Sequence, residues 1–465
     1  MTSPRPTRPT RPRSAGHRAS GDGAPGTPRR VMPPPVRPPG SDVTQLYGPE
    51  FAADPYGTYE RLREYGALAP VEISPGVGAM LVTDYRAALD LLHDPETWSK
   101  DSRTWMQSAP EDSPVLPMLA WRPNLFFSDG DAHERYRSAV TDAFERIPAH
   151  ELRTAVVEFA DSLIAKFGEK GEADLMAEYA RVLPLMLFNR LFGLPDSYSE
   201  QLITALAGVW EGRTAEEASA AGAAFEGYVG ELMAAKKQAR GEDLTSWFMD
   251  HPAGLSDEEV MHQTVITMGA GHEPTANLIA NALARMLTDD RYYSTLSGGA
   301  LTPLDAIHDV LRNEPPIANY SAHFPKRDVY FHGTWIRRGQ LVMVSYAAAN
   351  TQHGRMEPGA SGGASGSGGG SHLAWAAGPH SCPVQQPATL IATTAIERLT
   401  AWLSDIELTV RHDELTYRNG PFHRALTCLP ARFTPISPDQ PGATPWESRE
   451  SRPREERRTP AAPAR

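Results

Sequence analysis

One of the two cysteines in this 465-residue chain has the surroundings of a metal ligand or a nucleophile. Cys382 follows a Gly378-Pro379 turn and stands directly before an amphipathic stretch that predicts a helix beginning near Pro383. A sulfur at a helix N-terminus faces unpaired N–H groups and the positive end of the helix dipole, which favour thiolate over thiol. Pro383 suits the first helical position, where the N–H that it lacks would have no partner. A buried, inert cysteine explains this segment equally well.

A proline interrupts a long helical pattern at residues 268–287, MGAGHEPTANLIANALARML. Pro274 offers no N–H to the carbonyl of Ala270, so we expect a local opening of the helix that can hold water. Glu273 and Thr275 flank this proline. The alternative is a kinked core helix in which Glu273 forms a surface ion pair.

Two further helical segments place ionisable side chains on one face. In LDAIHDVLRNEPP, residues 304–316, Asp309 and Arg312 stand at i and i+3, which predicts a buried carboxylate–guanidinium fork. In HERYR, His133 and Arg137 stand at i and i+4, which puts them on one face of a helix.

The cysteine segment resembles the cysteine loop of cytochrome P-450 enzymes, which reads roughly Phe-x-x-Gly-x-x-x-Cys-x-Gly. Gly378 and Cys382 match it, with Trp375 in the place of Phe and Val384 in the place of the last Gly. In that family the sulfur accepts hydrogen bonds from backbone N–H groups just after it, and Pro383 offers none. Fewer such bonds would leave more electron density for iron and lower its potential.

Other segments resemble the same family and follow in the family's order. AGHEP, residues 270–274, is similar to the Ala-Gly-x-(Asp/Glu)-Thr motif of the oxygen-activating helix, with Pro274 at the Thr position. DVLR, residues 309–312, stands where the family has Glu-x-x-Arg, and NYSAHFP and RALTCLPARF resemble the later strands. The resemblance spans about residues 41–435 and is greatest to an actinobacterial subgroup in which the acid-x-x-Arg motif varies.

The resemblance implies a mainly α fold with small β-sheets, a triangular helical prism around a buried haem b. It also implies roles for residues of this chain: Cys382 as the axial thiolate ligand of the iron; His133, Arg137, His323 and His380 as contacts of the haem propionates; Glu273 as the group that delivers protons, helped by Thr275; and Asp309 with Arg312 as a structural pair.

The implied activity is that of a bacterial oxidoreductase, a monooxygenase of secondary metabolism that inserts one atom of O2 into a small apolar organic substrate. No flavin or iron–sulfur motif occurs in the chain, so we expect electrons from a separate ferredoxin and ferredoxin reductase. A substrate cavity is expected beside the loop at residues 100–127. Its large apolar side chains either line that cavity or simply pack: Trp105, Met106, Met118, Leu119 and Trp121.

Two alternatives to the monooxygenase stay open. The displaced Thr275 also fits a haem-binding protein that does not hydroxylate, such as a peroxide-driven enzyme or a ligand binder. A scaffold that has lost haem is the third interpretation. It predicts that Cys382 can be replaced without any spectral change.

Composition sets the limits of the folded region. Residues 1–40 carry eight Arg against one Asp and are rich in Pro, so we expect a disordered basic arm. The tail at 436–465 is expected to be disordered too, and the Gly/Ser-rich stretch at 356–371 to be a loop that replaces the family's meander. The formal charge of −12 argues against nucleic acid as a partner. With no apolar run long enough to span a bilayer, we expect a cytoplasmic protein.

The local patterns predict the main elements. A helix is expected at residues 55–66, a hairpin at 69–83 with its turn at Pro75-Gly76, and mostly helix over 131–287. Strands are expected within 329–345, near Thr409 and within 426–433.

Overall fold

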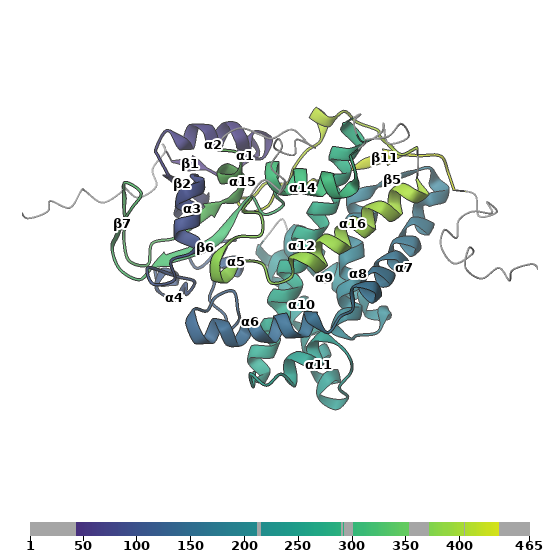
Figure 1. Ribbon diagram of the computed structural model, residues 1–465, viewed down its shortest axis with the longest axis horizontal. Coiled ribbons are helices and arrows are strands. Elements are labelled where there is room, and N and C mark those ends of the chain that lie inside the picture. The colour runs from purple at the N-terminus through teal and green to yellow at the C-terminus, as the bar shows by residue number, and fades with distance from the viewer. Residues whose placement is uncertain are drawn as a thin grey trace, which may run out of the picture. The chain divides into compact units, whose positions relative to one another are not determined.

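A computed structural model describes residues 43–211, 215–289, 292, 301–352, 372–403 and 405–436 (Figure 1). The predicted basic arm at 1–40, the Gly/Ser loop at 356–371 and the tail beyond Ile436 lie outside these residues. Among the helices within them, none is long and apolar enough to cross a bilayer.

Helices make up most of the described chain. Their bounds are α1 Pro49–Ala53, α2 Pro55–Arg63, α3 Tyr85–Leu92, α4 Arg103–Met106, α5 Leu116–Leu119, α6 Gly130–Glu145, α7 Ala149–Phe167, α8 Val182–Phe192, α9 Ser199–Glu211, α10 Ala215–Gln238, α11 Leu244–Met249, α12 Asp257–Thr288, α14 Pro303–Asn313, α15 Tyr346–Asn350 and α16 Gln385–Trp402.

The strands form three small sheets. Their bounds are β1 Thr44–Gln45, β2 Leu68–Ser74, β3 Val77–Val82, β4 Trp98–Ser99, β5 Glu172–Asp174, β6 Asn319–Pro325, β7 Val329–Phe331, β8 Thr334–Ile336, β9 Val342–Ser345, β10 Glu407–Leu408 and β11 Pro430–Arg432. One sheet has the order β1-β2-β3-β9-β6-β4, a second has β10-β11-β5, and β7 pairs with β8. This confirms the predicted mainly α fold with minor sheets.

The long helix α12 lies against α8, α14 and α16, and Figure 1 shows it passing through the helical part of the molecule. It begins with a capping box in which Ser256 and Glu259 satisfy each other's backbone N–H groups. At Gly271 a Cβ atom would come within 2.6 Å of the ring of Phe188, so this glycine is what allows α8 to approach so closely. The hydrophobic core around α12 includes side chains from α7, α8, α14 and α16.

The local predictions are largely confirmed. Asp54 caps α2 by accepting a hydrogen bond from the N–H of Gly57, and β2 pairs with β3 as the expected hairpin. The strand region at 329–345 proves to be the β7–β8 hairpin followed by β9. The helix α12 continues through Pro274, so any opening there is confined to the hydrogen bond that this proline cannot donate to Ala270.

Candidate functional site

The loop before α16 holds Cys382 in a defined backbone conformation. The N–H of Cys382 donates to the carbonyl of Trp375 at 2.8 Å. Gly378 has φ +67°, and a Cβ there would lie 2.2 Å from the carbonyl oxygen of Leu92 at the end of α3. This glycine is therefore required both by its backbone angle and by the close approach of α3.

The sulfur of Cys382 accepts a hydrogen bond from the N–H of Val384, the residue after the proline that has none to give. Burial raises the pKa of the Cys382 thiol, while the Val384 N–H and the guanidinium of Arg137 act in the opposite direction. The expectation that the start of α16 makes the thiolate the favoured form is thus wrong for the protein part alone. The loss of hydration at the sulfur outweighs the donors around it.

Arg137 fixes the cysteine loop from the side of α6. Its Nη1 donates to the carbonyl oxygen of Ser381 at 2.7 Å, and its charge acts on the neighbouring Cys382. One turn earlier on α6, His133 lies against His380 with ring centroids 4.0 Å apart. The predicted i, i+4 pair of α6 and the two residues of the cysteine loop are therefore gathered at one place.

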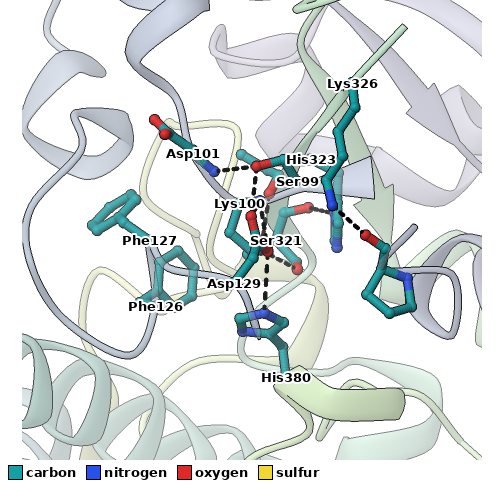
Figure 2. Close-up of polar contacts among 12 residues, drawn as sticks. Ser99, Lys100, Asp101, Phe126, Phe127, Asp129, Ser321, His323, Lys326 and His380 are labelled. Carbon is teal, nitrogen blue, oxygen red and sulfur yellow. Dashed lines mark hydrogen bonds and ion pairs between the residues drawn. The ribbon is translucent and has the colours of Figure 1, made fainter. Parts of the chain in front are cut away.

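Both histidines at this contact are neutral at physiological pH. Burial lowers the pKa of His133 to about 3, and it lowers the pKa of His380 as well. His380 approaches the carboxylate of Asp129 at 3.8 Å (Figure 2). Nε2 of His133 is buried and has no hydrogen-bond partner in the described part of the chain. A buried ring nitrogen without a partner costs free energy, so it marks a place for a polar group of a ligand.

His323 reaches the same cluster from strand β6. Its Nδ1 lies 2.7 Å from the carbonyl oxygen of Ser321, and burial lowers its pKa well below the ordinary value. The side chain is 4% exposed and is influenced by the charges of Lys100 and His380. The structure thus brings His323 together with His133, Arg137 and His380, as the sequence led us to expect.

Three members of this cluster were missed by sequence reasoning: Ser99, Lys100 and Asp129. The carboxylate of Asp129 accepts hydrogen bonds from Ser99 Oγ at 2.5 Å and from the N–H of Lys100, so it joins β4 to the start of α6 (Figure 2). Asp129 directly precedes α6 and had a weak signal as an N-cap residue. A single lysine carries no such signal, because lysines are usually exposed.

The acid of α12 has its recorded partners outside this cluster. Glu273 is 1% exposed and forms an ion pair with Arg418, and its Oε1 also accepts a hydrogen bond from Asn277 at 3.1 Å. This is a buried ion pair, not the surface pair considered as an alternative. Oε2 of Glu273 is buried and has no hydrogen-bond partner within the described residues.

Thr275 is buried two residues further along α12. Two residues correspond to more than half a turn, so Thr275 and Glu273 project from different sides of the helix. Ile266, Ala270 and Pro274 share a third face at spacings of four, and each is at least partly exposed. At the motif's alcohol position this face carries Pro274, while the hydroxyl of Thr267, seven residues earlier on the same side, donates to the carbonyl oxygen of Gln263 at 2.7 Å.

Asp309, the acid of the predicted fork with Arg312, also has a partner on another helix. The recorded ion pair of Asp309 is with Nε of Arg285 on α12, at 2.8 Å, and its Oδ1 accepts a hydrogen bond from Asn313 at 2.6 Å. The aspartate thus meets an arginine across the α12–α14 contact. The charge of Arg312 lowers the pKa of His372, second to burial. The pair still joins two core helices.

In the loop at residues 100–127, Trp105 and Leu119 are buried in the core around β6, and the ring of Trp105 lies 6.0 Å from that of Phe324. Met106 is 37% exposed, and its sulfur accepts a hydrogen bond from the N–H of Trp121. For Trp105 and Leu119, packing is therefore the interpretation that the structure favours.

The residues present fit a haem. Cys382 offers a soft sulfur ligand, and the cluster beside it has the chemistry needed for carboxylates: the guanidinium of Arg137, the ammonium of Lys100 and the unpartnered Nε2 of His133. Asp129 is the one carboxylate that the described contacts place among them. The cluster therefore has two cationic side chains, an unpartnered ring nitrogen and one carboxylate. This surplus of positive charge suits a group that carries two propionates.

The comparisons point to one family. The chain is 33% identical over 405 residues to the cytochrome P450 monooxygenase PikC of Streptomyces venezuelae, which covers 85% of this chain and 95% of that protein. It is 28% identical over 410 residues to the vitamin D(3) 25-hydroxylase of Pseudonocardia autotrophica, covering 86% and 98%. The solved structure of CYP154A1 from Streptomyces coelicolor matches with a TM-score of 0.73 and 26% identity, over 84% of this chain and 100% of that one. No protein-family model matches the chain.

Fold, site chemistry and relatives together define a haem-dependent monooxygenase. The chain belongs to the cytochrome P450 family. It is an oxidoreductase with haem b as its cofactor, which inserts one oxygen atom from O2 into a small organic substrate and receives electrons from redox partners.

Proposed function

We propose that Sγ of Cys382 would hold the haem iron and that His133, Arg137, His323 and His380 would bind the propionates. The observation that carries this proposal is the convergence of these side chains, from α6, β6 and the cysteine loop, at one buried place. Arg137 holds the loop in position through Ser381, and the N–H of Val384 supports the sulfur. Asp309 and Arg312 keep a structural role, with Arg285 as the ion-pair partner of Asp309.

When bound, the haem supplies the activation of dioxygen that lets one oxygen atom enter the substrate. The protein must deliver protons, and Glu273 is the proposed carrier. Arg418 and Asn277 hold its Oε1, so the unpartnered Oε2 is the atom at which a proton is held and passed on. The carbonyl of Ala270, which receives no hydrogen bond from Pro274, is a place for a water on the way. Thr275 is proposed as a helper.

The electron donors are proposed to be a ferredoxin and its reductase, because the chain has no flavin or iron–sulfur motif of its own. The substrate is proposed to be a small apolar molecule. This is supported by relatives that are named a vitamin D(3) 25-hydroxylase and a steroid C26-monooxygenase. The cytoplasmic location expected from the sequence stays a prediction.

The test is the absorption spectrum of the reduced protein under carbon monoxide. We expect the strongly red-shifted Soret band of thiolate-ligated haem in the wild type and its loss in Cys382→Ala. Cys428→Ala is the matched control, since Cys428 is an exposed free cysteine and its variant should keep the band. A red-shifted band that persists in Cys382→Ala would contradict the assignment of the ligand.

The electron donors are tested separately, by product formation from a panel of small apolar compounds. Turnover is expected with ferredoxin, reductase and O2. Turnover with hydrogen peroxide alone, and none with the redox partners, would favour the peroxide-driven alternative.

A further inference from the structure

Lys100 is a buried cation at the haem-facing cluster that the proposed function leaves without a role. Its side chain comes from the residue directly after β4, and the residue is 3% exposed. Nζ donates to Ser321 Oγ at 2.9 Å and to the carbonyl oxygen of Ala322 at 2.8 Å, both neutral acceptors of β6 (Figure 2). The structure records no ion pair for Lys100 among the described residues. An ammonium group has three N–H donors, so one is left for a further acceptor.

The pairing of β4 with β6 brings this lysine near His323. Trp98 faces Pro325 and Ser99 faces Phe324, and Lys100 follows directly after the end of β4. The charge of Lys100 acts on His323 and lowers its pKa, second to burial. His323 is neutral because of its burial. The positive charge at this edge of the cluster is therefore carried by Lys100.

The backbone of β6 is deformed at the point where it meets Lys100. Ser321 has φ +67°, a left-handed angle that is strained for a non-glycine residue. It lies within the irregularity of register between Tyr320 and His323. Here the hydroxyl of Ser321 and the carbonyl of Ala322 both accept from Nζ. Strain of this kind persists where the surroundings impose it, often at binding sites.

A buried ammonium with neutral acceptors alone is costly, because the loss of hydration is not repaid by a counter-charge. Two interactions reduce this cost only partly. The centroid of the Phe126 ring lies 4.7 Å from Nζ, and Asp129 attracts the ammonium over a longer range. The carboxylate of Asp129 accepts its hydrogen bonds from Ser99 and from the backbone N–H of Lys100. An anionic group bound at the cluster would supply the missing counter-charge.

We propose that Lys100 donates to a haem propionate and supplies, together with Arg137, the positive charge that holds the two carboxylates. This rests on the proposed function, because the haem must lie at Cys382 for its propionates to reach the cluster. Lys100 is thus a cofactor-binding residue contributed by the segment that follows β4, in addition to the histidines of α6, β6 and the cysteine loop. The competing explanation is that Lys100 only ties β4 to the bulge of β6.

The experiment measures the rate at which the full-length protein transfers haem to excess apomyoglobin. Lys100→Gln keeps an N–H donor for β6 and removes the charge, and Lys100→Met removes both. We expect both variants to release haem about 10- to 100-fold faster than the wild type, the usual value of a hydrogen bond to a charged group. Lys326→Gln is the matched control, since Lys326 is exposed just after β6 and donates to the carbonyl of Pro95. It should release haem at the wild-type rate.

A second ligand separates charge from packing. Haem dimethyl ester lacks both propionate charges, so esterification should accelerate release from the wild type by more than it accelerates release from Lys100→Gln. An equal effect of esterification in the two proteins would overturn the proposal, as would release from Lys100→Gln at the rate of the Lys326→Gln control.

The carbon monoxide spectrum of the same samples tests the proposed function separately. If the wild type shows the thiolate band and Cys382→Ala loses it while Lys100→Gln behaves like the control, only the role of Lys100 fails. A wild type that takes up no haem would overturn both proposals.

Discussion

The carboxylate of Glu273, in the middle of α12, forms an ion pair with the guanidinium of Arg418, which lies in the segment between β10 and β11. The side chains are 1% and 19% exposed, so the pair is largely shielded from water. The only acid in the AGHEP motif is therefore held from outside its own helix, and Asn277 adds a hydrogen bond one turn further along α12. Its position depends on the C-terminal segment as much as on α12.

The first prediction concerns the two roles of Glu273. Glu273→Gln keeps the size of the side chain and an oxygen for Arg418 but cannot release a proton at Oε2, so product formation should slow by about 100-fold. The solvent deuterium isotope effect on kcat should rise, because proton delivery then limits turnover. A purely structural role would leave the isotope effect unchanged.

Arg418→Met is the matched comparison for that prediction. It leaves the carboxylate buried without its counter-charge, which should lower the free energy of unfolding by about 3–5 kcal/mol. The double variant Glu273→Gln/Arg418→Met has no unpaired charge at this place. Its free energy of unfolding, measured with urea, should therefore be higher than that of Arg418→Met alone. Equal stability of the two would show that the ion pair has no energetic importance.

The second prediction concerns the glycine of the cysteine loop. Gly378→Ala puts a Cβ 2.2 Å from the carbonyl of Leu92 at a left-handed φ, so the loop must move away from α3 and haem content should fall. Gly333→Ala is the control, because Gly333 has φ +88° and nothing within 4 Å of its Cβ position. That variant should lose only about 1–2 kcal/mol, the cost of the backbone angle. Equal haem content in the two variants would show that the contact with Leu92 is unimportant.

Sequence reasoning succeeded where a feature depends on neighbours in the chain. The i, i+4 spacing placed His133 and Arg137 on one face of α6, and the Gly378 turn fixed the position of Cys382 before α16. The hairpin at β2 and β3 followed from its Pro-Gly turn. These features are local, so periodicity and turn residues were sufficient to predict them.

The partners of charged groups escaped prediction because they come from distant segments. Arg418 meets Glu273 and Arg285 meets Asp309 only after the helices and the C-terminal segment have packed. Lys100 had no signal in the sequence, since its burial results from the pairing of β4 with β6. The direction of the Cys382 pKa was also wrong, because the start of a helix shows the donors but not the extent of burial.

The third prediction tests which arginine pairs with Asp309. Asp309→Asn leaves Arg285 without a counter-charge in the core and should lower the free energy of unfolding by about 3 kcal/mol. A double-mutant cycle with Arg285→Gln should show a coupling of about 1–3 kcal/mol. The same cycle with Arg312→Gln should show less. A larger coupling to Arg312 would show that the fork expected from the sequence is the stronger of the two pairs.

The fourth prediction is a dependence of stability on pH that comes from Lys100. Burial lowers the pKa of its ammonium from an ordinary 10.5 to about 7, with attraction to Asp129 acting in the opposite direction. The folded apoprotein thus holds this proton more weakly than the unfolded chain does. Between pH 7 and 10 the unfolded chain keeps the proton that the folded chain has lost, so stability rises with pH in this window.

Below pH 7 both states are protonated and the full cost of the buried charge remains. Lys100→Met has no such cost, so its apoprotein should have a higher free energy of unfolding than the wild-type apoprotein. This difference should be greatest near pH 7 and should shrink toward pH 10. The other ionisable groups that face Lys100, namely Asp129, His133, His323 and His380, are present in both proteins, so their contribution largely cancels in the difference. Urea unfolding of the two haem-extracted proteins at pH 7, 8.5 and 10 measures the difference in their free energies of unfolding. A difference that stays constant with pH, as expected for Lys326→Met, would mean that Lys100 keeps its proton throughout and that its burial is already compensated within the protein.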